Sequence, residues 1–263
     1  MSNIAYKERI KGVFSGEIAA GWDTKGKLIA RLDGNDNIIY NAIKEYGNDG
    51  MAVLDVGCAT GKLLSMINKK FKRCQLYGID ICDDMVCYAS NIEMQNENKK
   101  SIIADDFLEY NFGDMLYDMV VFKFVLHHLE DQIAALRKAK SLLKEQGILL
   151  IYTPGKNHFA EVFPAREDKE DILGRMTISE LQYLFQKSNM ESVKFEECKF
   201  KMKMESFEDF IYFLKRIGSY QKIVRYTKES WDEIFLSSVR HKFIKTDWLE
   251  GEYILGIYQK QGE

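Results

Sequence analysis

The chain has 263 residues, of which 46% are hydrophobic and 29% are charged, a composition typical of one large globular domain. The formal net charge of -3 provides no basic field, so we expect neither nucleic acid nor a membrane surface as a partner. No apolar run approaches the roughly 20 residues that cross a bilayer, and Met1–Lys7 lacks the apolar core of a signal peptide. Five cysteines without a Cys-x-x-Cys pair predict reduced thiols in the cytoplasm and no metal site.

The first 50 residues predict a helical cap at the N-terminus. Phe14 and Ile18 are apolar anchors of the first part, and a second helix is expected from Ile38 to Tyr46. Tyr6 and Trp22 fit an aromatic helix that packs on the edge of a sheet, because large rings bury much apolar surface.

Residues 52–64 predict a strand, a tight glycine turn and a helix, which is how a nucleotide site begins in an open α/β sheet. Asp55 lies in the strand, and Gly57 and Gly61 follow, where the lack of a Cβ lets backbone pass close to a ligand. The spacing of the glycines excludes a P-loop, and Ala59 and Lys62 exclude a dinucleotide fingerprint. A turn that only closes a β–α connection remains the alternative.

Two further predicted strands end on carboxylates. The strand at 75–81 ends near Asp80, where a carboxylate can accept hydrogen bonds from both ribose hydroxyls or cap the next helix. The strand at 101–107 ends on Asp105 and Asp106, either of which can accept from an adenine amino group. A one-residue shift exchanges these two roles, and a pair of solvated turn acids is the alternative.

The fourth predicted strand begins at Tyr117 and is followed by two adjacent histidines. Its continuous apolar run is typical of a parallel strand buried on both faces. On a helix His127 and His128 would point roughly 100° apart, so they do not share a metal ion. His127 is the candidate general base, and the alternative for each histidine is a packed structural role.

The second half predicts one more parallel strand and a long insertion. A helix is expected at 134–144, a strand at 148–153, and then a polar loop at 155–175 over the cleft. Thr177 and Glu180 predict a capping box that starts a further helix. Two last strands are expected, and the residues between them carry helical patterns. The order of elements from 52 to 153 predicts a doubly wound, mostly parallel sheet.

The sequence Asp55-Val-Gly-Cys-Ala-Thr-Gly61 resembles motif I of class I S-adenosylmethionine (SAM)-dependent methyltransferases, and residues 50–153 carry the later motifs in order. The resemblance implies an α/β fold with a seven-stranded Rossmann-like sheet, an antiparallel last strand and a helical lid insertion. It also implies SAM as cofactor and the following cofactor-binding residues: Tyr6, Trp22, Asp55, Gly57, Cys58, Ala59, Gly61, Asp80, Ile81, Met85, Asp105, Asp106, Phe107, Phe122 and Lys123.

We expect a single domain over residues 1–263. A helical cap would span 1–50, the core would span 51–204 and 246–263, and the lid insertion would span 205–245. The lid loosely resembles the C-terminal region of malonyl-acyl carrier protein and trans-aconitate methyltransferases. Candidate substrate residues are His128, Arg225, Tyr226 and Arg240, with solvated helix faces as the alternative.

The resemblance therefore implies methyl transfer from SAM to a small-molecule or carrier-bound acceptor, at a carboxylate or hydroxyl oxygen or at nitrogen. A malonyl-acyl carrier protein O-methyltransferase-like activity is one form of this function, and a monomer or homodimer is expected. The alternatives are a non-catalytic SAM-binding module and a dehydrogenase. Methylation of nucleic acid is disfavoured by the negative charge and by the lack of an Asn/Asp-Pro-Pro-Tyr tetrad after the fourth strand.

Overall fold

The computed structural model describes residues 3–22, 37–162, 174–191, 193–202, 206–216, 237, 240–245 and 248–262. Its strands are β1 (Ala52–Val56), β2 (Gln75–Asp80), β3 (Lys99–Ala104), β4 (Tyr117–Lys123), β5 (Leu143–Pro154), β6 (Lys194–Met202) and β7 (Leu249–Gln259). Its helices are α1 (Asn3–Phe14), α2 (Glu17–Gly21), α4 (Asn37–Tyr46), α5 (Lys62–Lys70), α6 (Asp83–Ser90), η1 (Leu126–His128), α7 (Gln132–Ser141), α8 (Ile178–Lys187) and α9 (Phe207–Arg216).

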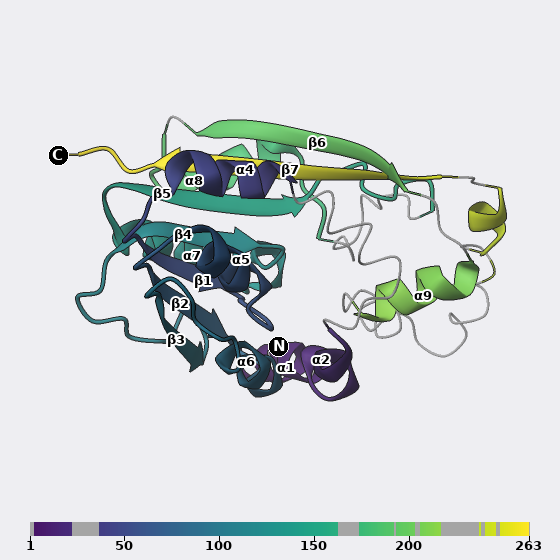
Figure 1. Ribbon diagram of the computed structural model, residues 1–263. Helices are drawn as coiled ribbons and strands as arrows, with labels where there is room; N and C mark the ends of the chain where they lie inside the picture. Colours follow the sequence, from purple (N-terminus) through teal and green to yellow (C-terminus); the bar gives the residue numbers. More distant parts are fainter. Residues whose placement is uncertain are drawn as a thin grey trace.

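The strands form one seven-stranded sheet in the order β3-β2-β1-β4-β5-β7-β6 (Figure 1). Strands β1 to β5 are parallel to one another, and β7 runs antiparallel between β5 and β6. The chain moves outward from β1 to β3 and then returns to β4, so the strand order reverses between β1 and β4. Open α/β sheets bind ligands at the carboxyl ends of the strands beside such a point. The predicted doubly wound, mostly parallel fold is confirmed.

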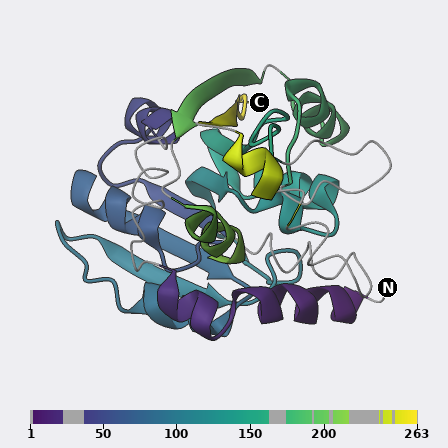
Figure 2. The ribbon, with the colours of Figure 1, turned by 90° about the vertical axis from the view of Figure 1, so that its right-hand side faces the viewer.

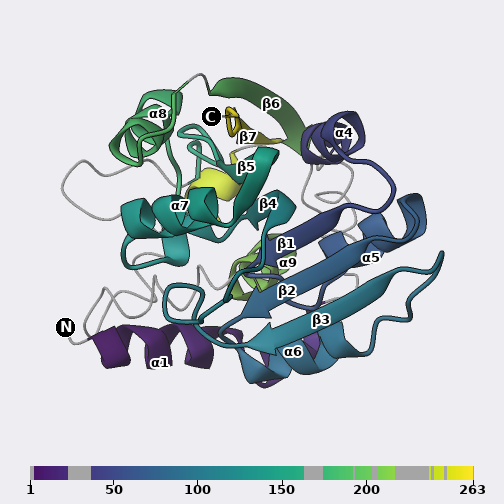
Figure 3. The same cartoon turned by 90° about the vertical axis from the view of Figure 1, so that its left-hand side faces the viewer.

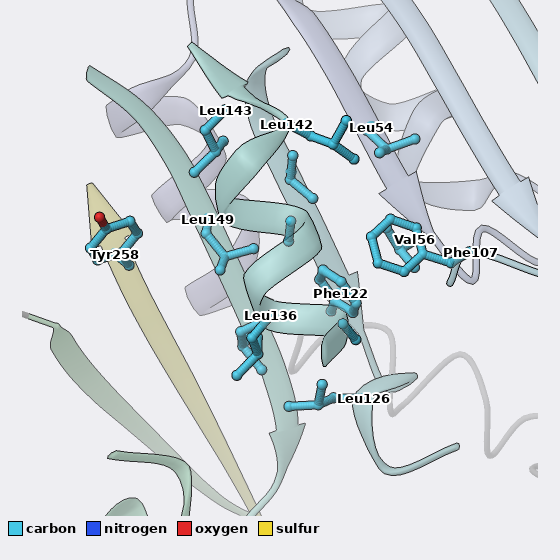
Figure 4. Close-up of a cluster of buried hydrophobic side chains, with 14 of the residues drawn as sticks. Leu54, Val56, Phe107, Phe122, Leu126, Leu136, Leu142, Leu143, Leu149 and Tyr258 are labelled. Carbon is cyan, nitrogen blue, oxygen red and sulfur yellow. The ribbon is translucent and has the colours of Figure 1, made fainter. Parts of the chain in front are cut away.

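Apolar side chains bury both faces of the sheet. Helices α4, α5 and α6 cover one face, and α7 and α8 cover the other (Figure 3). Figure 4 shows the apolar core on the face covered by α7 and α8, in which Leu136 of α7 lies over Leu149 of β5 and Phe122 of β4. Because both faces are covered there, the central strands β1 and β4 are mainly apolar, whereas the edge strand β3 begins with Lys99 and Lys100 and is only partly buried.

The helix predicted at 134–144 is shorter in the structure, and the following strand starts earlier than expected. Helix α7 ends at Ser141, and Leu143 already pairs with Tyr117 of β4. The Tyr117 amide donates to the Leu142 carbonyl at 2.8 Å, so pairing with β4 captures the end of the helical pattern. The capping box is present: the Thr177 side chain accepts from the Glu180 amide, and the Glu180 side chain accepts from the Thr177 amide.

The N-terminal helices lie at the carboxyl end of the parallel strands. Figures 1 and 2 show α1 and α2 beside α6, next to the turns that follow β2 and β3. The cap therefore consists of α1 and α2 at the end of the sheet where the strand order reverses, whereas α4, from the same expected 1–50 segment, packs on a face of the sheet.

Candidate functional site

The turn between β1 and α5 is held against the end of β2. The Gly57 amide donates to the Ile79 carbonyl at 2.8 Å. Gly57 and Gly61 have positive φ angles of 68° and 79°, which favour glycine. A Cβ on Gly57 would lie 2.4 Å from Val125, and one on Gly61 would lie 2.4 Å from Ile92. Protein side chains, rather than a ligand, therefore fill the space that these two glycines leave.

Asp80, at the end of β2, fastens two turns at once. Its Oδ2 accepts from the Ala59 amide at 2.8 Å, and its Oδ1 accepts from the Cys82 amide at 2.9 Å. Burial raises the pKa of Asp80, and these two hydrogen bonds oppose the rise. Each oxygen holds one bond and can accept a second, so the carboxylate can also bind hydroxyl donors of a ligand. Cys82 is the residue just before α6, so Asp80 also ties the start of this helix to the end of β2.

Asp55 and Lys123 are two titratable residues that lie at the reversal point. Asp55 lies beside Val121 in the register of β1 and β4, and Lys123 follows two residues later, so both face the same side of the sheet. Burial raises the pKa of Asp55 to about 8; the charge of Lys123 opposes this shift, and that of Asp80 adds to it. The Lys123 Nζ lies 5.7 Å from the centroid of the Tyr40 ring on α4.

The two acids after β3 differ in their contacts. Asp106 pairs with Lys7 of α1 at 2.9 Å and accepts from the Leu108 amide at 2.6 Å. Asp105 is exposed, and its Oδ1 accepts from the Asp106 amide at 2.7 Å. Asp106 therefore fixes the turn and the cap, which leaves Asp105 as the more accessible carboxylate of the pair.

Two aromatic residues predicted near the cofactor lie in the core instead of on an open surface. The Phe122 side chain is fully buried, and the Phe107 ring packs edge-on against it with centroids 5.4 Å apart. Cys58 is also buried, and Ile81 is half-buried after β2. The Phe122 and Phe107 rings thus support the strand ends from inside, and any contact of their own with a ligand stays a prediction.

The N-terminal cap brings aromatic rings to the glycine turn. Ala19, Cys82 and Met85 form a small buried cluster, against which Phe14 and Trp22 pack together with Ala59 of the turn. The Phe14 and Trp22 ring centroids are 5.8 Å apart, with the rings nearly perpendicular. Tyr6 lies in the first half of α1. The structure thus places Trp22 against the cluster that contains Met85, and contact of either residue with a cofactor stays a prediction.

Polar contacts dock the cap onto the turns after β2 and β3. The Gly16 amide donates to Asp84 Oδ2 at 2.7 Å, and Ser15 Oγ lies 3.4 Å from Cys82 Sγ. Lys7 pairs with both Asp106 and Glu109. Burial alone would lower the pKa of Lys7, but the hydrogen bonds with the two carboxylates raise it above its ordinary value.

His127 and His128 lie on the short 3₁₀ turn η1, with ring centroids 4.1 Å apart. A Cβ on Gly174 would lie 2.2 Å from the His127 ring, so that ring packs against the Gly174 backbone. The His128 ring instead meets Phe14 of the cap, with centroids 5.3 Å apart. His128, rather than His127, is therefore the histidine that joins the cap.

The substrate residues expected in the lid are only partly described. Arg225 and Tyr226 lie outside the described residues. Arg240 pairs with Glu208 at 3.5 Å, and its guanidinium lies 5.5 Å from the Phe207 ring centroid. These contacts hold Arg240 to the start of α9, and its role in substrate binding stays a prediction.

Sequence reasoning missed polar residues at the ends of β5 and β7. Glu252 is 5% exposed and Thr153 is fully buried, and among the described residues neither Glu252 Oε2 nor Thr153 Oγ1 has a hydrogen-bond partner. The Glu252 amide donates to Nδ1 of the buried His158 at 3.2 Å. His158 and Phe159 are buried, so residues 155–162 pack as a folded turn and not as the polar loop that we expected. Their polar neighbours in the sequence concealed this burial.

Carboxylates and backbone turns at the reversal point of a Rossmann-like sheet define a nucleotide-type site. A family model for the methyltransferase domain matches residues 31–194, and the chain belongs to this family. Within the described residues, no helix is long and apolar enough to cross a membrane, and no group of three or more His, Cys, Asp or Glu side chains could hold a metal ion.

The chain is similar to curated enzymes over part of their length. It is 26% identical over 179 residues to a malonyl-[acyl-carrier protein] O-methyltransferase of Priestia megaterium, which covers 65% of this chain and 64% of that protein. A protein of the same name from Bacillus cytotoxicus is 25% identical over 54% of this chain and 49% of its own length. The chain thus spans less than two-thirds of each of these relatives.

Solved structures show the same fold at low identity. The plantazolicin methyltransferase BpumL, in complex with a pentazolic desmethylPZN analogue and S-adenosylhomocysteine (SAH), matches with a TM-score of 0.59 and 14% identity over 98% of this chain and 96% of its own. Phosphoethanolamine N-methyltransferase 2 of Haemonchus contortus, in complex with SAM, matches with a TM-score of 0.55 and 18% identity over 86% of this chain and 53% of its own.

Proposed function

We propose that the protein binds SAM at the ends of β1 to β4 and transfers its methyl group to a small-molecule or carrier-bound acceptor. One observation carries this proposal, namely the order of polar groups across the reversal point. Asp105 follows β3, Asp80 ends β2, and the pair of Asp55 and Lys123 lies between β1 and β4. That order matches SAM read from adenine through ribose to methionine.

The residues present fit the cofactor chemically. The Asp80 carboxylate would hold the ribose hydroxyls with the accepting capacity that remains on its two oxygens. Asp55 and Lys123 lie on one face, where the Lys123 ammonium can pair with the carboxylate of the methionine part and the Asp55 carboxyl can accept a hydrogen bond from its ammonium. Asp105 would accept from the adenine amino group, with Asp106 held away by Lys7.

The chemistry asks the protein mainly for positioning. Bound SAM supplies a methyl group that its sulfonium already activates. The chain must therefore hold the acceptor atom in line with the bond between the sulfur and the methyl carbon, and it must exclude water. We assign both tasks to the docked cap and η1. A hydroxyl or ammonium acceptor also needs a base, for which His127 on η1 is the candidate, whereas a carboxylate acceptor needs none.

The acceptor class rests on the relatives and not on the geometry. The Priestia relative is named for O-methylation of a malonyl-acyl carrier protein, and the Haemonchus neighbour for N-methylation of phosphoethanolamine. We propose an oxygen or nitrogen acceptor on this basis, with a malonyl-acyl carrier protein O-methyltransferase-like activity as its narrower form.

Turnover with an acceptor panel tests the proposal. Purified protein is incubated with SAM and with carrier-bound malonyl groups, free carboxylates, alcohols and amines, and SAH is quantified by mass spectrometry. We expect SAH above the acceptor-free background with one class. Asp80→Asn should raise the dissociation constant of SAM by about fivefold or more, because it removes a charged hydrogen-bond acceptor. A melting curve controls for its fold.

Two outcomes would contradict the proposal. SAM binding without methyl transfer to any acceptor class would favour a non-catalytic SAM-binding module. Tighter binding of NADH than of SAH, measured by calorimetry, would favour a dehydrogenase.

A further inference from the structure

Phe14 packs between two turns of the candidate site, and the glycine turn packs against the same buried cluster. Phe14 packs against the buried cluster that includes Cys82 and Met85 after β2, and Ala59 of the turn after β1 packs against the same cluster. Its ring also meets His128, which follows β4, with centroids 5.3 Å apart. In the sheet β1 lies between β2 and β4, so Phe14 spans the end of β1.

The ring of Phe14 is fixed in orientation by its neighbours. The Trp22 and His128 rings meet it at interplanar angles of 81° and 79°, and these two near-perpendicular contacts restrict its rotation. The backbone just after it is tied down, because the Gly16 amide donates to Asp84 at 2.7 Å. Phe14 is half-buried and so keeps part of its surface open.

The proposed cofactor places its positive sulfur between the two halves of this site. The sulfonium joins the adenosine part, assigned to Asp80, and the methionine part, assigned to Asp55 and Lys123. The carboxylates of the nearby turns have other partners: Asp80 accepts from two amides, Asp84 from Gly16, and Asp106 pairs with Lys7. An aromatic face attracts such a cation without a counter-charge.

We propose that Phe14 recognises the sulfonium of SAM through its ring, and that Trp22 and His128 act as positioning residues for that ring. This inference rests on the proposed function, because it needs SAM at the ends of β1, β2 and β4. As a consequence, Phe14 makes the site bind SAM more tightly than SAH, because the sulfur of SAH is uncharged. The ring thus helps release the product after transfer.

Calorimetry with SAM and SAH as separate probes tests the inference without an acceptor. Phe14→Leu keeps an apolar side chain but removes the ring, and it should weaken SAM about fivefold more than SAH. Phe14→Tyr keeps the ring and should preserve the ratio of the two dissociation constants. Tyr88→Leu removes an exposed ring of α6 and is a matched control that should change neither constant.

The ratio separates recognition from packing. Equal weakening of SAM and SAH in Phe14→Leu, or an unchanged pair of constants, would overturn the proposal. His128→Leu gives a second test that leaves α1 intact, and it should move the ratio in the same direction. If the unmodified protein bound neither SAM nor SAH, the proposed function itself would fail, which is a different result from a lost ratio.

Discussion

Asp55 links the site to stability through its protonation. Burial raises its folded-state pKa to about 8, whereas an aspartate in the unfolded chain titrates near pH 4. Between these values the folded protein holds a proton that the unfolded chain has released. The contribution of Asp55 to the free energy of unfolding therefore falls as the pH rises from about 4 to about 8, and it levels off above that range.

Asp55→Asn should flatten this pH dependence. Without SAM, the unfolding free energy of the unmodified protein should fall more steeply between pH 5 and pH 8 than that of the variant, by up to about 1.4 kcal/mol per pH unit. Urea denaturation at four pH values measures both profiles. Because all other titrating groups are shared, parallel profiles would show that the Asp55 carboxyl is already charged at neutral pH.

Glu252 carries a buried oxygen that has no hydrogen-bond partner among the described residues. Leaving a buried polar group unpaired is costly, so Glu252→Met should raise the unfolding free energy by about 1 kcal/mol. Glu250→Met is the control on the same strand, since its exposed ion pair with Lys201 contributes little. A less stable Glu252→Met protein in urea denaturation would show that this carboxyl has a stabilising partner.

At the scale of elements, helices α1 and α2 form a cap that contacts the turns after β2 and β3. Lys7 of α1 is its main ionic anchor, with carboxylates on both sides of the turn after β3. The cap also carries Phe14 and Trp22, so its docking and the shape of the cofactor site are coupled.

Lys7→Met should loosen the cap and speed the release of SAH. We expect a two- to fivefold higher dissociation rate in stopped-flow fluorescence, because a partly exposed ion pair contributes up to about 1 kcal/mol. High salt should produce the same change in the unmodified protein and little further change in the variant. Lys11→Met is the control, since Lys11 lies 3.9 Å from the exposed Asp83. Equal rates of SAH dissociation in the unmodified protein, Lys7→Met and Lys11→Met would show that the ion pairs of Lys7 do not hold the cap in place.

At the scale of the whole molecule, the parallel half of the fold follows from local pattern. Apolar runs that end on Asp80 or near Lys123 predict their strands, since both faces of those strands are buried. Long-range contacts are not readable in this way. The residues near Phe14 in the sequence do not predict its contact with His128, and those near Glu252 do not predict its hydrogen bond with the buried His158.

The limits of local pattern also explain the error after α7. Residues 134–144 have a helical pattern, but β4 pairs with Leu143 and captures the end of the segment. The candidate site shows the same division. The carboxylates were found from their positions at strand ends, whereas the packing of Val125 against Gly57 required the folded chain.

The position of β7 has a consequence for how the protein is made. This strand lies inside the sheet, between β5 and β6, although it is the last strand along the chain. Within the described sheet β6 pairs only with β7, so it has no partner until residues 249–259 have emerged from the ribosome. Until then the edge of β5 also stays open. Late in synthesis the nascent chain therefore leaves one edge of β5 and both edges of β6 unpaired, and a chaperone would protect it most at that stage.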